Sequence, residues 1–152
     1  MLLIVLLLTV GGVLDGQLRK EAPVRENPFV GRWIANLSKS RPHPDFKFQR
    51  VTLQIDVAGD TVKMASVVVD PNGKERRAAE TFRSDGTETP GTLTPGVTHI
   101  ARFVGSHVLA TIANKDGELF AMITYEVSAD GKTLRSRSSG MLEQVIVFDR
   151  QP

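Results

Sequence analysis

Residues 51–60 read Val-Thr-Leu-Gln-Ile-Asp-Val-Ala-Gly-Asp. Apolar and polar residues alternate in this stretch, and the alternation ends at an Ala-Gly-Asp tripeptide of the kind found in tight turns. A period of two places the apolar side chains on one face of a β-strand and the polar ones on the other. The stretch therefore predicts a half-buried strand followed directly by a turn, and the same unit recurs along the chain.

Further turns are expected at Asn72-Gly73, Asp85-Gly86, Asp116-Gly117 and Asp130-Gly131, because these dipeptides supply the positive φ angles that hairpins need. No stretch after the first 16 residues has a helical stripe of more than two turns. Two Pro-containing segments, 38–45 and 87–96, are expected to be loops. The strands that we expect span 29–37, 46–57, 61–69, 75–83, 97–104, 107–114, 118–128, 132–139 and 143–149.

Short consecutive strands joined by tight turns imply an antiparallel meander, which hides its edges by closing into a barrel or by splitting into a sandwich. Residues 28–152 are therefore expected to form a single all-β domain without long helices. The chain length of 152 residues suits one domain, and a composition of 41% hydrophobic and 24% charged residues argues against disorder.

Composition excludes several classes of function. The 19 basic and 17 acidic residues are dispersed along the chain, whereas a nucleic-acid binder concentrates its basic residues on one face. The chain has no cysteine, which excludes disulfides, thiolate catalysis and cysteine-based metal centres. The three histidines lack metal-site spacing. We therefore predict no metal, no cofactor and no nucleic-acid partner, and leave the oligomeric state open.

Residues 1–14 read Met-Leu-Leu-Ile-Val-Leu-Leu-Leu-Thr-Val-Gly-Gly-Val-Leu. This run is too short for a membrane-spanning helix and fits the apolar region of a secretory signal peptide, although no basic residue precedes it. We predict that residues 1–16 are a signal peptide and 17–27 a flexible lead, so that the mature protein is secreted or periplasmic without stable insertion in a membrane. The alternative is a buried N-terminal strand.

Residues 29–33, Phe-Val-Gly-Arg-Trp, followed by Ser-Lys-Ser at 38–40, resemble the opening of the calycin barrels, the lipocalins and fatty-acid-binding proteins. Residues 145–150 resemble the closing strand of that superfamily. With Val-Ser-Ala-Asp-Gly-Lys-Thr-Leu at 127–134, the stretch 29–150 is similar to a family of small exported bacterial lipocalin-like proteins. The resemblance implies an antiparallel up-and-down β-barrel of eight to ten strands, without the helices that lipocalins and fatty-acid-binding proteins add.

The resemblance also implies a structural role for three residues. In lipocalins an arginine on the last strand packs over the face of the tryptophan, and here Arg150 is the candidate for that contact, with Arg137 as second choice. Gly31 beside Trp33 leaves room for the indole and a neighbouring backbone to close the end of the barrel.

Candidate binding residues follow from the strand pattern. Tyr125 and Ile123 share the apolar parity of the stripe that runs from Leu119 to Val127, so the tyrosine ring is expected inside, where its hydroxyl needs a partner. His99 and Arg102 lie on the strand 97–104. Arg102 belongs to a group of charged strand residues that either hold a ligand carboxylate or line the wet outer face.

Small side chains at inward positions leave room inside the barrel, which favours a cavity for a small hydrophobic or amphipathic molecule over a filled core. No pair of acidic or basic residues has a spacing diagnostic of an enzyme. The expected ligand-binding residues are Tyr125, Arg102, His99 and Ile123, and no catalytic residue is predicted. Two alternatives remain: a barrel enzyme with an interior acid or base, and an interaction module with a filled core. The interior positions that we expect include Leu53, Ile55, Val67, Val69, Leu109, Ile123 and Val145.

Overall fold

The computed structural model describes residues 26–140 and 142–152. The predicted signal peptide, and all but two residues of the predicted lead, lie outside the described residues. The described part contains ten strands and one short 3-10 helix, which are β1 (Gly31–Ala35), η1 (Leu37–Lys39), β2 (Arg50–Ala58), β3 (Thr61–Val69), β4 (Glu75–Arg83), β5 (Thr89–Pro90), β6 (Val97–Val104), β7 (Val108–Lys115), β8 (Glu118–Val127), β9 (Thr133–Gly140) and β10 (Gln144–Arg150).

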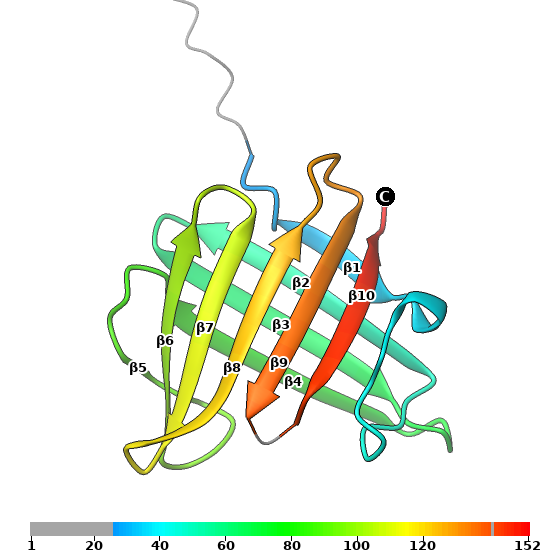
Figure 1. Cartoon of the computed structure of the whole chain (residues 1–152), viewed down its shortest axis with the longest axis horizontal. Coiled ribbons are helices and arrows are strands. Elements are labelled where there is room, and N and C mark those ends of the chain that lie inside the picture. The colour runs from blue at the N-terminus through cyan, green and yellow to red at the C-terminus, as the bar shows by residue number, and fades with distance from the viewer. Residues whose placement is uncertain (1–25, 141) are drawn as a thin grey trace, which may run out of the picture.

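The strands form one antiparallel sheet in the order β4-β3-β2-β1-β10-β9-β8-β7-β6-β5. The sheet curls so that β2–β4 lie behind β6–β10 around a common interior (Figure 1). Neighbours along the chain pair with each other, and β1 also pairs with β10, which brings the two ends of the domain side by side. The predicted all-β, up-and-down barrel without long helices is confirmed. Its one seam lies where β4 comes alongside β5 and β6.

Two of the expected elements differ from the structure. The strand expected from residue 46 begins at Arg50. The loop expected at 87–96 contains the two-residue strand β5, which pairs with His99 and Thr98 of β6. A two-residue strand that ends in proline carries neither alternation nor strand propensity, so the sequence pattern could not indicate it.

The interior is filled at one end by large apolar side chains. Leu53, Ile55 and Leu109 are buried in the interior, as expected. The prediction was wrong for Val67 and Val145, because their cross-strand partners, Thr52 and Arg137, share with them the outer face of the sheet.

Trp33 closes this end of the barrel. Its side chain is fully buried, and its indole Nε1 donates a hydrogen bond to the Phe29 carbonyl at 3.0 Å. The guanidinium carbon of Arg150 lies 4.1 Å from the centre of the indole ring, which is a cation–π geometry. Arg150 Nη1 donates to the Val30 carbonyl at 2.7 Å, and Nε donates to the Gly131 carbonyl at 2.6 Å. Arg150 thus ties β10 to the segment before β1 and to the turn that contains Gly131, over the face of the indole.

Gly31 makes this stacking arrangement sterically feasible. A Cβ atom at this position would lie 2.7 Å from Arg150 Nη1, closer than van der Waals contact allows. Its φ of 136° is also a conformation that side chains other than glycine rarely adopt. The structure therefore places Gly31, Trp33 and Arg150 together at the closed end.

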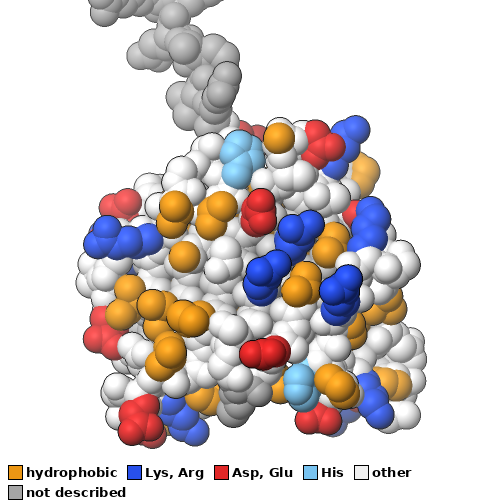
Figure 2. Space-filling view, viewed as in Figure 1, with side chains coloured by type: hydrophobic (Ala, Val, Ile, Leu, Met, Phe, Trp, Pro, Cys, Tyr) orange, Lys and Arg blue, Asp and Glu red, His pale blue; other side chains and the backbone are white. Residues whose placement is uncertain are grey.

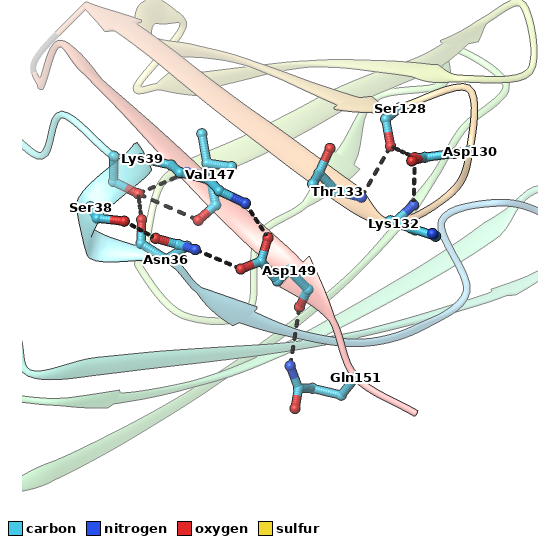
Figure 3. A network of polar contacts seen from close by, with 11 residues as sticks. Asn36, Ser38, Lys39, Ser128, Asp130, Lys132, Thr133, Val147, Asp149 and Gln151 are labelled. Atoms are coloured by element: carbon cyan, nitrogen blue, oxygen red, sulfur yellow. Dashed lines mark hydrogen bonds and ion pairs between the residues drawn. The ribbon is translucent and has the colours of Figure 1, made fainter.

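The Ser-Lys-Ser tract fastens the segment after β1 to the outside of β10 (Figure 3). Asn36 Nδ2 donates to Asp149 Oδ2 at 2.6 Å, and Lys39 Nζ lies 3.1 Å from Asp149 Oδ1. These donors, Asn36 first, lower the pKa of the Asp149 carboxyl below its usual value. Ser40 Oγ donates to the Asn36 carbonyl at 2.7 Å and accepts from the Val147 amide at 2.9 Å.

The 127–134 stretch, which also contributed to the resemblance, forms the turn between β8 and β9 (Figure 3). Ser128 Oγ donates to Asp130 Oδ1 at 2.5 Å, and that oxygen also accepts from the Lys132 amide at 3.0 Å. The Thr133 amide donates to Ser128 Oγ at 3.0 Å. The bonds from the Ser128 hydroxyl and the Lys132 amide lower the pKa of Asp130, with Ser128 as the largest cause. The Ser-Lys-Ser tract and the 127–134 stretch therefore have structural roles.

Candidate functional site

A cavity of about 280 Å³ lies inside the barrel, away from the end that Trp33 closes. Most of its wall is apolar and comes from facing strands, with Leu53 and Met64 on one side and Ile123 and Phe148 on the other. The volume is close to the lower end of the range for small-molecule sites, about 300 Å³. The interior therefore contains a cavity, whereas the interaction-module alternative requires a filled core.

Tyr125 on β8 and Ser136 on β9 face each other across the strand pair and both line this cavity. Neither hydroxyl has a hydrogen-bond partner among the described residues. Among the described residues, every fully buried side-chain oxygen or nitrogen has a hydrogen-bond partner. Two hydroxyls without a partner are therefore not fully buried, and both open onto the cavity that their side chains line. Burial raises the pKa of Tyr125 to about 12, so its hydroxyl stays protonated near neutral pH and can donate.

The other hydroxyls on this side of the wall are already engaged. Thr111 Oγ1 donates to the Ile123 carbonyl at 3.0 Å, within the β7–β8 pair. Ser138 Oγ donates to the Leu142 carbonyl at 2.7 Å. On the β7–β9 wall, Tyr125 and Ser136 are therefore the pair of donors available to a guest molecule.

Glu80 on β4 and His99 on β6 meet across the seam of the barrel. Glu80 Oε2 lies 3.8 Å from His99 Nε2, and both side chains line the cavity. The Glu80 carboxylate also holds the segment that crosses the seam, because the Leu93 amide donates to Oε1 at 3.0 Å and the Thr92 amide donates to Oε2 at 3.2 Å. Part of the 87–96 loop thus has an internal role, as the cover of the seam.

The structure brings three of the four predicted ligand-binding residues to this cavity. Tyr125, Ile123 and His99 line it, whereas Arg102 is exposed on the outer face of β6 beside Gly86. Glu126, which follows Tyr125 in the sequence, also lies outside, with its carboxylate 3.9 Å from the Arg135 guanidinium. Arg102 therefore lies apart from the other three predicted ligand-binding residues.

Sequence reasoning missed Ser136, although a signal for it existed. β9 alternates from buried Leu134 through exposed Arg135 and half-buried Ser136 to exposed Arg137. Basic side chains accordingly gather on the outer face over β9 and β10 (Figure 2). The parity of Leu134 would have placed the serine inside and both arginines outside.

Within residues 26–140 and 142–152, no group of three acidic or histidine side chains is placed to hold a metal ion. In the same part of the chain, none of the helices has the length and apolar character that crossing a bilayer requires.

No protein-family model matches the chain, and no curated protein matches it either. Solved structures do match in shape. Fatty-acid-binding protein 1 of Echinococcus granulosus superposes with a TM-score of 0.60 over 84% of this chain and 100% of its own, at 15% identity. A mutant of the fluorescent protein UnaG gives 0.60 over 82% and 97%, at 18% identity. The chain has a calycin-type fold.

Zebrafish ileal bile acid-binding protein, solved with cholic acid, also matches this calycin-type barrel, with a TM-score of 0.53 over 82% of this chain and 99% of its own. Its identity of 16% means that the likeness concerns the fold. The calycin resemblance read from the sequence is confirmed at that level, and the closer resemblance to exported bacterial proteins stays a prediction.

Tyr125 is the single tyrosine of the chain, so tyrosinate absorbance reports on it alone. We expect a titration midpoint near 12 in the folded protein and near about 10 in denaturant. Because the folded-state pKa is the higher one, the stability that goes with the neutral hydroxyl is fully present below about pH 10. The free energy of unfolding then falls by about 2 kcal/mol as the pH rises to the folded-state pKa. A folded-state midpoint near about 10 would place the hydroxyl in bulk water instead.

Proposed function

We propose that this protein binds one small hydrophobic or amphipathic molecule inside the barrel. The observation that carries the proposal is the cavity of about 280 Å³ with a mainly apolar wall and two hydroxyls, those of Tyr125 and Ser136, open to it. An apolar wall gains about 0.8 kcal/mol for each methylene that leaves water, and a few hydrogen bonds then orient the guest. Matching structures that are fatty-acid and bile-acid binding proteins support the same use of the fold.

Native mass spectrometry of the purified protein, followed by organic extraction, tests this function. The expected result is a small molecule at one copy per chain that is lost on denaturation, or, in a ligand-free preparation, one saturable site for the neutral dye Nile red. A ligand-free protein without a saturable dye site would contradict the proposal.

A second candidate function, acid–base chemistry on the bound molecule, has one observation in its favour. Glu80 and His99 face each other at 3.8 Å on the cavity wall. Incubating the extracted ligand with fresh protein distinguishes the two functions. A ligand of unchanged mass and structure supports a carrier, whereas conversion that stops in the His99→Asn variant supports an enzyme.

We also propose that the protein is exported, with residues 1–16 as the signal peptide. The support is the apolar run at 1–14, which has the length and composition of a signal-peptide core. Fractionation of cells that make the full chain with a C-terminal tag tests it. We expect a shortened chain in the periplasm or medium, and an uncut chain in the cytosol would refute the export.

A further inference from the structure

We propose that the cavity selects amphiphiles whose buried polar group is uncharged, a hydroxyl or a carbonyl, over amphiphiles that carry a carboxylate. This inference rests on the proposed binding function and names the ligand class for that same cavity. The observations that carry it are the paired hydroxyls of Tyr125 and Ser136, the Glu80 carboxylate on the wall, and the outward direction of the nearby arginines.

Tyr125 and Ser136 form the polar anchor. They are direct cross-strand partners, so both side chains lie on the inner face of the sheet and both hydroxyls can donate to a polar group held in the same part of the cavity. A neutral hydroxyl or carbonyl is satisfied by such a pair, because each serine and tyrosine hydroxyl can donate one hydrogen bond and accept others. Most of the remaining wall is apolar, and its nearest hydroxyls, those of Thr111 and Ser138, are engaged with backbone carbonyls, so it suits an alkyl chain or ring system.

Glu80 supplies the fixed charge of the wall. Its side chain is only 15% exposed, and it is already held by the Thr92 and Leu93 amides. A ligand carboxylate would enter the same small, poorly solvated space and would be repelled by it. His99 offers no compensation, since any positive charge on its ring, 3.8 Å away, is balanced by Glu80 itself.

The basic side chains lie elsewhere. Arg135 and Arg137 flank Ser136 in sequence but are exposed on the outer face, as is Arg102. Among the described residues, no lysine or arginine lines the cavity. Arg76 shares the inner face of the β3–β4 pair as the partner of Val68, yet it is exposed at the rim. A carboxylate buried beside Tyr125 would therefore lack an ion-pair partner on the described wall.

Decanol and decanoate, which differ only in the polar end, test the selection by displacement of Nile red from the purified full-length protein. At about pH 8 free decanoate is fully ionised. We expect decanol to bind at least about tenfold more tightly than decanoate, because an unpaired buried charge costs more than a paired hydroxyl.

Three variants test the residues behind this difference. Tyr125→Phe should weaken the binding of decanol about fivefold by removing one hydrogen-bond donor. Glu80→Gln should reduce the difference in affinity between the two ligands, because decanoate then binds more tightly. Arg76→Ala should leave the affinity for decanol unchanged.

The outcomes separate the two proposals. Binding of decanoate as tight as that of decanol would overturn this inference and leave the binding function standing. No binding of Nile red, decanol or decanoate would overturn the binding function and the inference with it. If Glu80→Gln loosens the seam and lowers stability, seen by circular dichroism, the ratio of the two affinities in the unmodified protein still decides the question.

Discussion

Ligand binding is expected to fall by at least about a hundredfold when Ser136 is replaced by phenylalanine, because the new ring occupies the cavity that the ligand needs. Ser136 lines the cavity from the middle of β9 and has no partner to lose among the described residues. Filling an existing void costs little compared with overpacking a dense core, so the barrel should remain folded, with a change in stability below about 2 kcal/mol. Displacement of Nile red measures the affinity, and circular dichroism confirms the fold.

Ser139→Phe is the matched control for this variant. It places the same side chain on the same strand, but on the outer face, where Ser139 pairs with the exposed Met122. We expect its affinity to stay within about twofold of the original, as for surface substitutions in general. If Ser136→Phe bound as tightly as Ser139→Phe, the ligand would have to sit somewhere other than this cavity.

Trp33→Ala is expected to lower the free energy of unfolding by about 3–5 kcal/mol. Trp33 is fully buried, and its loss would remove the largest side chain of the core, the hydrogen bond to Phe29 and the surface on which Arg150 stacks. A domain of this size is stable by about 5–15 kcal/mol, so the loss is a large fraction of the total. Urea denaturation followed by far-ultraviolet circular dichroism measures it, because the single tryptophan itself is removed.

Two controls define how the Trp33 result is interpreted. Trp33→Phe keeps an aromatic surface under Arg150 and should cost clearly less than Trp33→Ala. Leu119→Ala, at a position that is 59% exposed, should change stability by no more than about 0.5 kcal/mol. A loss below about 1 kcal/mol for Trp33→Ala would mean that this end of the barrel does not depend on the indole.

The strands and their order could be predicted because the signals are local. The dipeptides Asn72-Gly73, Asp116-Gly117 and Asp130-Gly131 form the turns that they predicted, with positive φ at each glycine. Between the turns, alternation fixes which face of each strand is buried. A meander of hairpins leaves a barrel and a sandwich open, and the resemblance around Trp33 implied the barrel, in which β1 pairs with β10.

What could not be predicted depends on contacts between distant segments. The apolar runs around Val67 and Val145 give no parity, so their outward direction follows only from the observed register. β5 and the attachment of Thr92 and Leu93 to Glu80 depend on how the sheet curls and where its seam falls. Arg102 was predicted to bind a ligand because of its charge, but the cavity is lined instead by Ser136, whose small neutral side chain gives a weaker sequence signal.

The single tyrosine allows the most direct measurement on the central claim, that a small amphiphile sits in the cavity beside Tyr125. Isotope-labelled tyrosine in the full chain isolates the ring signals of Tyr125 in a filtered nuclear Overhauser spectrum recorded with unlabelled decanol. Binding in this cavity predicts cross-peaks between the ring protons and the alkyl chain, which disappear in Ser136→Phe and persist in Ser139→Phe. Saturable binding of decanol without any contact to the Tyr125 ring would contradict it.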